Sequence, residues 1–231
     1  MSGQKPFEVI FEDNHLLVVN KSSGVLVQGD ATGDTPLVEL CKSYIKEKHH
    51  KPGAVFMGVV HRLDRPVSGI VVLARTSKGL ERMNALFREK QTTKIYWAIV
   101  KKEPQQREGT LIHWLLKDEK KNKTTAFTRE TDGAQRSELS YQVIGNAVGC
   151  WLLEVRPVTG RSHQIRVQLA SMGCPIKGDL KYGDDHANED GSICLHARQL
   201  HFIHPVKKDA VVFTAPLPPS GLWKYFLKFS S

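Results

Sequence analysis

The sequence predicts an α+β fold, in which a largely antiparallel mixed sheet is flanked by helices and loops. Segments with the alternation of strands outnumber segments with helical spacing. The connections between the strands are mostly of hairpin length, and such connections favour antiparallel pairing. We find no linker that divides the 231 residues, so residues 1–231 are expected to form a single domain.

The first third of the chain predicts a hairpin, a helix and two further strands. Phe7–Phe11 and Leu16–Asn20 are predicted strands, joined through a turn-prone Asp-Asn pair. Pro36 is expected at the first position of a helix. Apolar residues then recur at helical spacing, at Leu37, Leu40, Cys41, Tyr44 and Ile45. Two buried strands are expected at Val55–Val60 and Ile70–Ala74.

The remainder predicts two more amphipathic helices, a meander of strands and a short final helix at Leu222–Leu227. Ser77 is expected to cap a helix with an apolar face formed by Leu80, Met83, Leu86 and Phe87. Ser162 is expected to cap another, with its core face formed by Ile165, Leu169 and Met172. Strands are predicted at Lys94–Val100, Leu111–Leu116, Thr124–Thr128, Leu139–Ile144, Trp151–Val155, Ala197–Ile203 and Val211–Ala215.

Composition narrows the class of protein. Lys and Arg exceed Asp and Glu by 33 to 24, giving a net charge of +9 that suits a polyanionic partner. The apolar runs are too short to cross a bilayer, and Met1–Pro6 carries no apolar signal sequence, so a cytoplasmic protein without a membrane partner is expected. The four cysteines are too far apart for a zinc knuckle, and reduced thiols are expected.

A polar loop, His61–Ser68, holds the first candidate for chemistry. In it, Asp64 stands between Arg62 and Arg65, with predicted strands on both sides. Nearby cations keep such a carboxylate ionised, and an ionised carboxylate can be a nucleophile, a base or a metal ligand. An ordinary ion pair within a loop explains the same pattern.

A second candidate lies at Thr159–Arg166, where a glycine-led turn opens a predicted helix. Arg161, His163, Gln164 and Arg166 fall in its first turns. A helix start with two arginines favours an anion, either a phosphate or the Asp64 carboxylate. The alternative is a basic, solvated helix end.

Three further patterns are less specific. Alternation places Tyr96 on one face of its strand with Lys94 and Ala98, where it can stack on a base or simply pack in the core. The charged segment Lys117–Lys123 is a solvated hairpin tip or a loop that touches RNA. His196, His201 and His204, which His61 and His163 could join, lack the spacing of a metal motif, so no metal site is expected.

Taken together, these motifs resemble those of the RluA family of RNA pseudouridine synthases. His61-Arg62-Leu63-Asp64 with Ser68-Gly69 is similar to the family's catalytic motif, and Lys94-x-Tyr96-x-Ala98 to its tyrosine motif. Gly160–Arg166 is similar to its third motif. Smaller matches occur in family order at Asn20-Lys21, Ile176-x-Gly178-Asp179, Leu195-His196-Ala197 and His204-Pro205.

The resemblance implies the pseudouridine synthase catalytic fold and an isomerase that converts a specific uridine of rRNA or tRNA to pseudouridine. It assigns the catalytic carboxylate to Asp64, with Arg166 keeping it ionised and Tyr96 stacking on the flipped-out uracil or taking a proton. Arg62 is expected to fill the gap left by the base, and Ile165 and Leu195 to wall the pocket. The substrate-binding set is completed by Arg161, His163, Gln164 and His196.

The same resemblance implies that no cofactor is needed, and that a monomer acts on an RNA stem-loop without the additional N-terminal RNA-binding domain of many relatives. Two other classes of protein stay open at this stage. A nucleic-acid-binding module without catalysis shares the positive charge, and a metal hydrolase would use the histidines.

Overall fold

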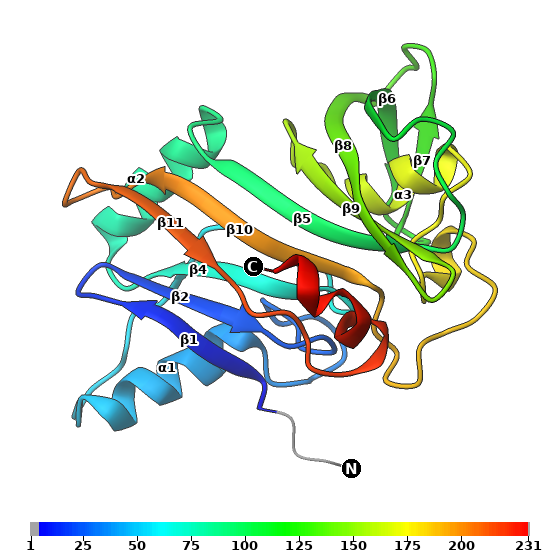
Figure 1. The fold of residues 1–231 in the computed structure, drawn as a ribbon. Helices are drawn as coiled ribbons and strands as arrows, with labels where there is room; N and C mark the ends of the chain where they lie inside the picture. Colours follow the sequence, from blue (N-terminus) through cyan, green and yellow to red (C-terminus); the bar gives the residue numbers. More distant parts are fainter. Residues whose placement is uncertain (1–4, 231) are drawn as a thin grey trace. The chain divides into compact units, whose positions relative to one another are not determined.

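A computed structural model describes residues 5–230, and the chain divides into two compact units (Figure 1). Unit 1 holds the described residues up to Thr93 together with Ala197–Pro216. Unit 2 holds Lys94–His196 and the described residues from Leu217 onward. The expectation that residues 1–231 form a single domain stays a prediction.

Unit 1 is a sheet with two helices. Its strands follow the order β1-β2-β4-β10, with β3 beside β4 and β11 beside β10. The strands are β1 (Phe7–Glu12), β2 (Leu16–Lys21), β3 (Gly58–Val59), β4 (Ser68–Ala74), β10 (Leu195–Ile203, in this unit from Ala197) and β11 (Ala210–Thr214). The helices are α1 (Leu37–Lys48) and α2 (Ser77–Arg88).

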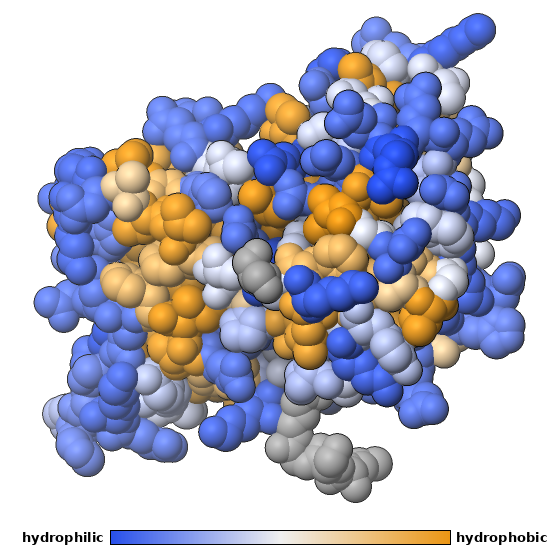
Figure 2. All heavy atoms as spheres, in the orientation of Figure 1, coloured by the Kyte–Doolittle hydropathy of each residue, from blue (hydrophilic) through white to orange (hydrophobic). Residues whose placement is uncertain are grey.

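The core of unit 1 explains why its strands read as continuous apolar runs. All residues of β4 are buried, and the first four residues of β2 are fully buried. One cluster joins Leu16, Val18, Ile70 and Val72 to Met83 of α2 and to residues of β10 and β11. On the outside, an apolar area lies over β1 and β11 in Figure 2, and exposed apolar side chains of these strands and β10 include Val9, Ile203 and Val212.

Three local expectations for unit 1 are wrong in detail. Pro36 is the extended N-cap, with ψ at 160°, and the helix begins at Leu37. The cap of α2 is Thr76, whose hydroxyl accepts the Gly79 N–H at 3.0 Å, and Ser77 is the first helical residue. The strand expected at Val55–Val60 shrinks to two residues, because β10 is the neighbour of β4 on the edge opposite β2, and β3 pairs only with Leu73 and Ala74.

Unit 2 is an antiparallel sheet with one α-helix, and the meander predicted for its strands is wrong in order, because β8 pairs with β6 and leaves β7 at the edge. Its strands follow the order β5-β9-β8-β6-β7 and every pairing between them is antiparallel. They are β5 (Thr93–Val100, in this unit from Lys94), β6 (Glu108–Asp118), β7 (Lys123–Phe127), β8 (Gln135–Ala147) and β9 (Cys150–Pro157). Helix α3 (Gln164–Ser171) and the 3₁₀ helices η1 (Leu180–Tyr182) and η2 (Gly221–Phe229) complete the unit. The predicted α+β class with antiparallel pairing is confirmed.

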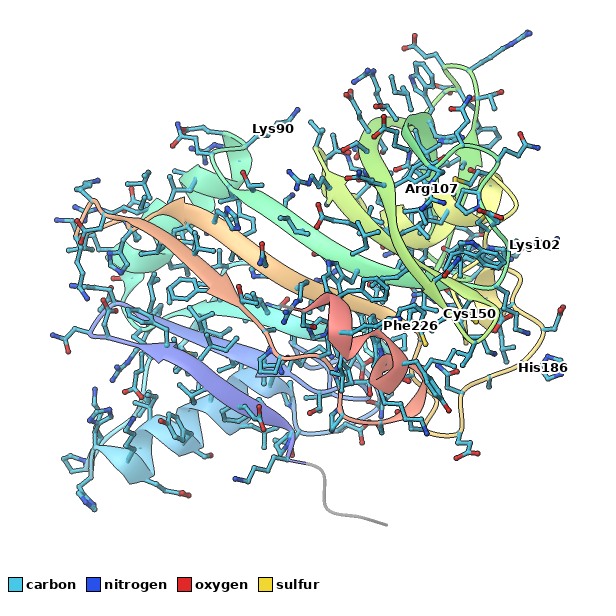
Figure 3. All side chains as sticks on the ribbon, in the orientation of Figure 1. Lys90, Lys102, Arg107, Cys150, His186 and Phe226 are labelled. Atoms are coloured by element: carbon cyan, nitrogen blue, oxygen red, sulfur yellow. The ribbon has the colours of Figure 1, made fainter. Side chains whose placement is uncertain are left out.

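The ends of the helices in unit 2 also differ from expectation. Helix α3 has His163, not Ser162, as its N-cap, and the helix is buried at every position from Gln164 to Leu169. The predicted final helix is the 3₁₀ helix η2, which is anchored by buried Trp223 and Phe226 (Figure 3). All four cysteines of the chain are buried and unbonded to one another. Within residues 5–230, no helix combines the length and the apolar character that crossing a membrane requires.

Candidate active-site residues

Asp64 lies in unit 1, in the loop that leads into β4. It is half-buried, and its carbonyl oxygen accepts the Val67 N–H at 3.0 Å, which closes a turn. The loop leads into Gly69, the second residue of β4, which has a φ of +114°. A Cβ at this position would collide with the backbone of Ala197. Only glycine therefore allows the start of β4, directly after the Asp64 loop, to approach β10 this closely.

The buried side chain of Lys21 is hydrogen-bonded to the backbone of the Asp64 loop. The side chain of Lys21 is fully buried, and its Nζ donates to the carbonyl oxygens of Val25 at 2.8 Å, Ser22 at 2.9 Å and Arg65 at 3.3 Å. Burial lowers the pKa of Lys21 to about 7; the Asp64 charge opposes this, and the Arg65 charge adds to it. Lys21 thus fixes the backbone next to Asp64, and the Asp64 charge raises the pKa of Lys21.

The two arginines beside Asp64 have different surroundings. Arg65 is bonded to a neighbouring loop, through an ion pair with Asp34 at 2.6 Å and a hydrogen bond from its Nε to the Gly24 carbonyl. Arg62 is exposed. His61 stacks on Phe87 with centroids 4.9 Å apart, and its Nε2 accepts the Val72 N–H.

The other predicted site residues lie in unit 2. Tyr96 is half-buried on β5, in register with Val155 of β9. Leu195 and His196 are buried, and the ring of His196 meets Trp223 edge to face, with centroids 5.8 Å apart. The expected alternation along β5 is present, since Ile95 and Trp97 are buried while Lys94 and Tyr96 are partly exposed.

The turn before α3 is held by one side chain. Gln164 is buried, and its Oε1 accepts hydrogen bonds from the Thr159 hydroxyl at 2.8 Å and the Arg161 N–H at 3.0 Å. Its Nε2 donates to the Glu138 carbonyl. The amide of Gln164 therefore organises the turn, and Arg161 is left exposed at the surface. A direct role of Gln164 in binding substrate stays a prediction.

Arg166 forms a buried, two-point ion pair that sequence reasoning did not anticipate. Its Nε and Nη2 donate to the two carboxylate oxygens of Asp179, at 2.7 and 2.8 Å. Both side chains are almost completely buried. The guanidinium carbon lies 5.1 Å from the centre of the Tyr182 ring. A two-point ion pair of this kind restricts the directions in which the guanidinium can face.

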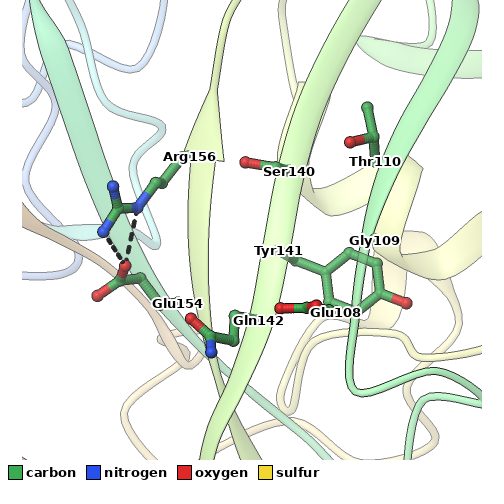
Figure 4. A pocket seen from close by; sticks show the side chains of 8 residues that line it. All are labelled: Glu108, Gly109, Thr110, Ser140, Tyr141, Gln142, Glu154 and Arg156. Carbon is green, nitrogen blue, oxygen red and sulfur yellow. Dashed lines mark hydrogen bonds and ion pairs between the residues drawn. The ribbon is translucent and has the colours of Figure 1, made fainter.

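A surface hollow of about 470 Å³ lies elsewhere in unit 2, across β6, β8 and β9 (Figure 4). An ion pair between Glu154 and Arg156 spans one side of it. Its lining, in the described part of the chain, includes none of the predicted site residues. Among residues 5–230, no three His, Cys, Asp or Glu side chains are grouped in a way that could hold a metal ion.

A basic chain with an α+β fold, in which a structured loop carries the Asp64 carboxylate, belongs to the class of candidate RNA-modifying enzymes. Comparison with known proteins is more specific. The model of the RNA pseudouridylate synthase family matches residues 15–171 of the 231, and the chain belongs to this family. The predicted resemblance is confirmed. The match includes the Asp64 loop, Tyr96 and the start of α3.

Individual relatives agree with this placement. The chain is 32% identical over 225 residues to "Ribosomal large subunit pseudouridine synthase C" of Vibrio cholerae, covering 90% of this chain and 65% of that protein. The protein of the same name from Pasteurella multocida is 34% identical over 218 residues, covering 92% and 65%. The chain thus spans about 65% of the length of these relatives.

A solved structure has the same fold. "Human RNA Pseudouridylate Synthase Domain Containing 4" matches with a TM-score of 0.75 and 26% identity, over 91% of this chain and 88% of that chain.

Proposed function

We propose that this protein is an RNA pseudouridine synthase, an isomerase that converts a specific uridine of ribosomal RNA to pseudouridine. The main support for this proposal is the family match over residues 15–171, which includes Asp64, Tyr96 and Arg166. The named relatives from Vibrio and Pasteurella are described as acting on the large ribosomal subunit, which favours rRNA over tRNA as the substrate. A cytoplasmic monomer acting without a cofactor is part of the proposal.

The reaction rearranges one nucleoside without any redox change. The bond between ribose C1′ and uracil N1 breaks, the base turns, and a bond forms between C1′ and C5. C5 loses its proton and N1 gains one, so atoms and electrons balance. Asp64 is proposed as the catalytic carboxylate; attack on the ribose, removal of a ribose proton and addition to the base all require it to be ionised.

The other residues take supporting roles in the proposal. Tyr96 stacks on the uracil and takes the C5 proton, directly or through water. Arg166, already aimed by Asp179, stabilises the anionic carboxylate. A uridine inside an RNA stack must be extruded first, and the exposed Arg62 is suited to fill the gap it leaves.

The C5 proton provides the test. RNA carrying tritium at uracil C5 releases the label when pseudouridine forms. We expect the wild-type protein to release tritium from large-subunit rRNA fragments, and Asp64→Asn to reduce the release at least about a hundredfold while RNA binding persists. Transfer RNA serves as the competing substrate. Absence of release from every RNA, or an active Asp64→Asn variant, would overturn the proposal.

A further inference from the structure

Tyr182 lies where three segments of unit 2 meet. It is 8% exposed and belongs to a small core with Leu115 and Val167. Its hydroxyl oxygen accepts the backbone N–H of Thr124 at 2.8 Å and lies 2.7 Å from Nδ1 of His163. Burial raises the pKa of Tyr182, so the hydroxyl keeps its proton at neutral pH.

One of these segments is the β6–β7 hairpin, which is bonded to the start of α3 close to its turn. Thr124 pairs with Lys117 in the second pair from the turn, and its hydroxyl donates to the Ser162 carbonyl at 3.0 Å. Next to Tyr182, Lys181 donates to the carbonyl of Asn122 in the turn at 2.9 Å. The turn also carries exposed Lys120 and Lys121, which are suited to the phosphates of RNA.

The other side of Tyr182 faces the helix that carries Arg166. His163, the N-cap of α3, has a left-handed backbone with φ at 55°, a conformation that is strained for residues other than glycine. Its ring meets Tyr182 edge to face. Arg166 contacts both the Asp179 carboxylate and the face of the Tyr182 ring, so a displacement of Tyr182 changes the packing of Arg166.

We propose that Tyr182 is a positioning residue whose hydroxyl couples the β6–β7 hairpin to His163 and Arg166, so that RNA bound at the hairpin sets the orientation of Arg166. The inference rests on the proposed function and adds to it a link between binding of the RNA backbone and catalysis. Because coupling between two sites is reciprocal, a hairpin engaged by RNA stabilises the hydrogen-bonded arrangement, and that arrangement favours RNA binding.

The first test separates positioning from folding. Tyr182→Phe keeps the ring that contacts Arg166 and removes both hydrogen bonds of the hydroxyl. The matched control is Tyr141→Phe in the same unit: Tyr141 is 7% exposed, and its hydroxyl donates to the Gln106 carbonyl at 3.2 Å. We expect Tyr182→Phe to slow tritium release about tenfold in single turnover at saturating RNA, and Tyr141→Phe to change it less than about twofold.

The second test measures the coupling itself. Replacing Lys120 and Lys121 by Ala should reduce RNA affinity in both backgrounds. In the wild-type background it should also slow the saturated single-turnover rate about fivefold, whereas in the Tyr182→Phe background the rate should not fall further. Equal slowing in both backgrounds would overturn the proposal. So would an unchanged rate in Tyr182→Phe, or a loss that Tyr141→Phe reproduces.

Failure of the proposed function is recognised separately. If the wild-type protein releases no tritium from any RNA, the synthase assignment falls, and the coupling is then measured by RNA affinity alone. The Lys120 and Lys121 replacements and Tyr182→Phe should still show non-additive losses of affinity, by at least about threefold. Strictly additive losses would overturn the role of Tyr182.

Discussion

The pH dependence of stability should reveal the buried charge of Lys21. We compare the wild-type protein with Lys21→Met, which preserves the straight side chain and removes the ammonium group. The replacement leaves the Ser22, Val25 and Arg65 carbonyls without this donor, which destabilises the variant. It also removes the cost of burying a charge, so the two effects partly cancel at pH 7.

The pH window follows from the two pKa values. The pKa of Lys21 is about 7 in the folded protein against 10.5 for an ordinary lysine. Between pH 7 and 9 the folded protein releases this proton while the unfolded chain keeps it, and stability rises with pH wherever the unfolded state binds more protons. Each pH unit contributes about 1.36 kcal/mol, and Lys21 is half-titrated at pH 7. Between pH 7 and 9 the free energy of unfolding of the wild type should therefore rise by about 2 kcal/mol relative to that of Lys21→Met.

Urea unfolding at pH 7, 8 and 9 measures this difference. Lys46→Met is the control, since Lys46 is an exposed lysine on α1, and its stability relative to wild type should be independent of pH in this range. A constant difference between wild type and Lys21→Met from pH 7 to 9 would refute the reasoning, because it would mean that Lys21 titrates at its ordinary pKa when folded.

Three further predictions concern other parts of the chain. Tyr96→Phe should retain RNA affinity but form product at least about tenfold more slowly in single turnover, whereas equal rates would leave the ring with stacking alone. Arg62→Ala should slow reaction on a structured stem-loop more than on a single strand, where unstacking costs less, and equal slowing would exclude the wedge role. Although burial alone raises the pKa of Glu12, its bonds to Lys48, His49 and Tyr44 lower it to about 2. Because this folded pKa lies below the ordinary 4.5, Glu12 should stabilise the fold above pH 4.5 and lose that contribution as pH falls towards 2. Acid unfolding of Glu12→Gln should lack this component, and an identical acid profile would contradict the assigned bonds.

The regular elements could be predicted because the pattern that identifies them is local. The strands β6 to β9 follow from alternation and hairpin-length connections, and the helices from apolar spacing. Their order does not, because β8 pairs with β6 and not with β7. The failures are tertiary. A strand at Val55–Val60 depends on whether a neighbouring edge is free, and β10 takes most of that edge. The left-handed His163 could not be predicted either. Its ring is hydrogen-bonded to Tyr182, which is distant in the sequence, and the side chain of Gln164 accepts the Arg161 N–H within the turn.

The same division applies to the candidate site. Asp64, Tyr96 and Arg166 can be proposed from the sequence because each stands in a short, recognisable motif. The residues that hold them were not assigned a role, because their bonds cross long sequence distances: Lys21 reaches Arg65, and Arg166 reaches Asp179. One signal was present in the sequence. Lys21 follows directly on the apolar run Leu16–Val19 and Asn20, and a lysine at the end of a mostly buried strand needs hydrogen-bond acceptors such as backbone carbonyls.

A buried cation in each unit fixes the segment that bears a proposed functional group. In unit 1 the cation is Lys21, which is held by neutral carbonyl oxygens and stabilised by the Asp64 charge. In unit 2 it is Arg166, which is held by the full charge of Asp179. The consequence is an asymmetry between the two. Removing the charge of Asp64 takes away the interaction that raises the pKa of Lys21, so Asp64→Asn should shift the pH window of Lys21 below that of the wild type. Arg166 is held instead by its ion pair with Asp179. Loss of activity in Asp64→Asn should therefore be accompanied by a pH-dependent change in the stability of unit 1, with the Arg166–Asp179 pair intact.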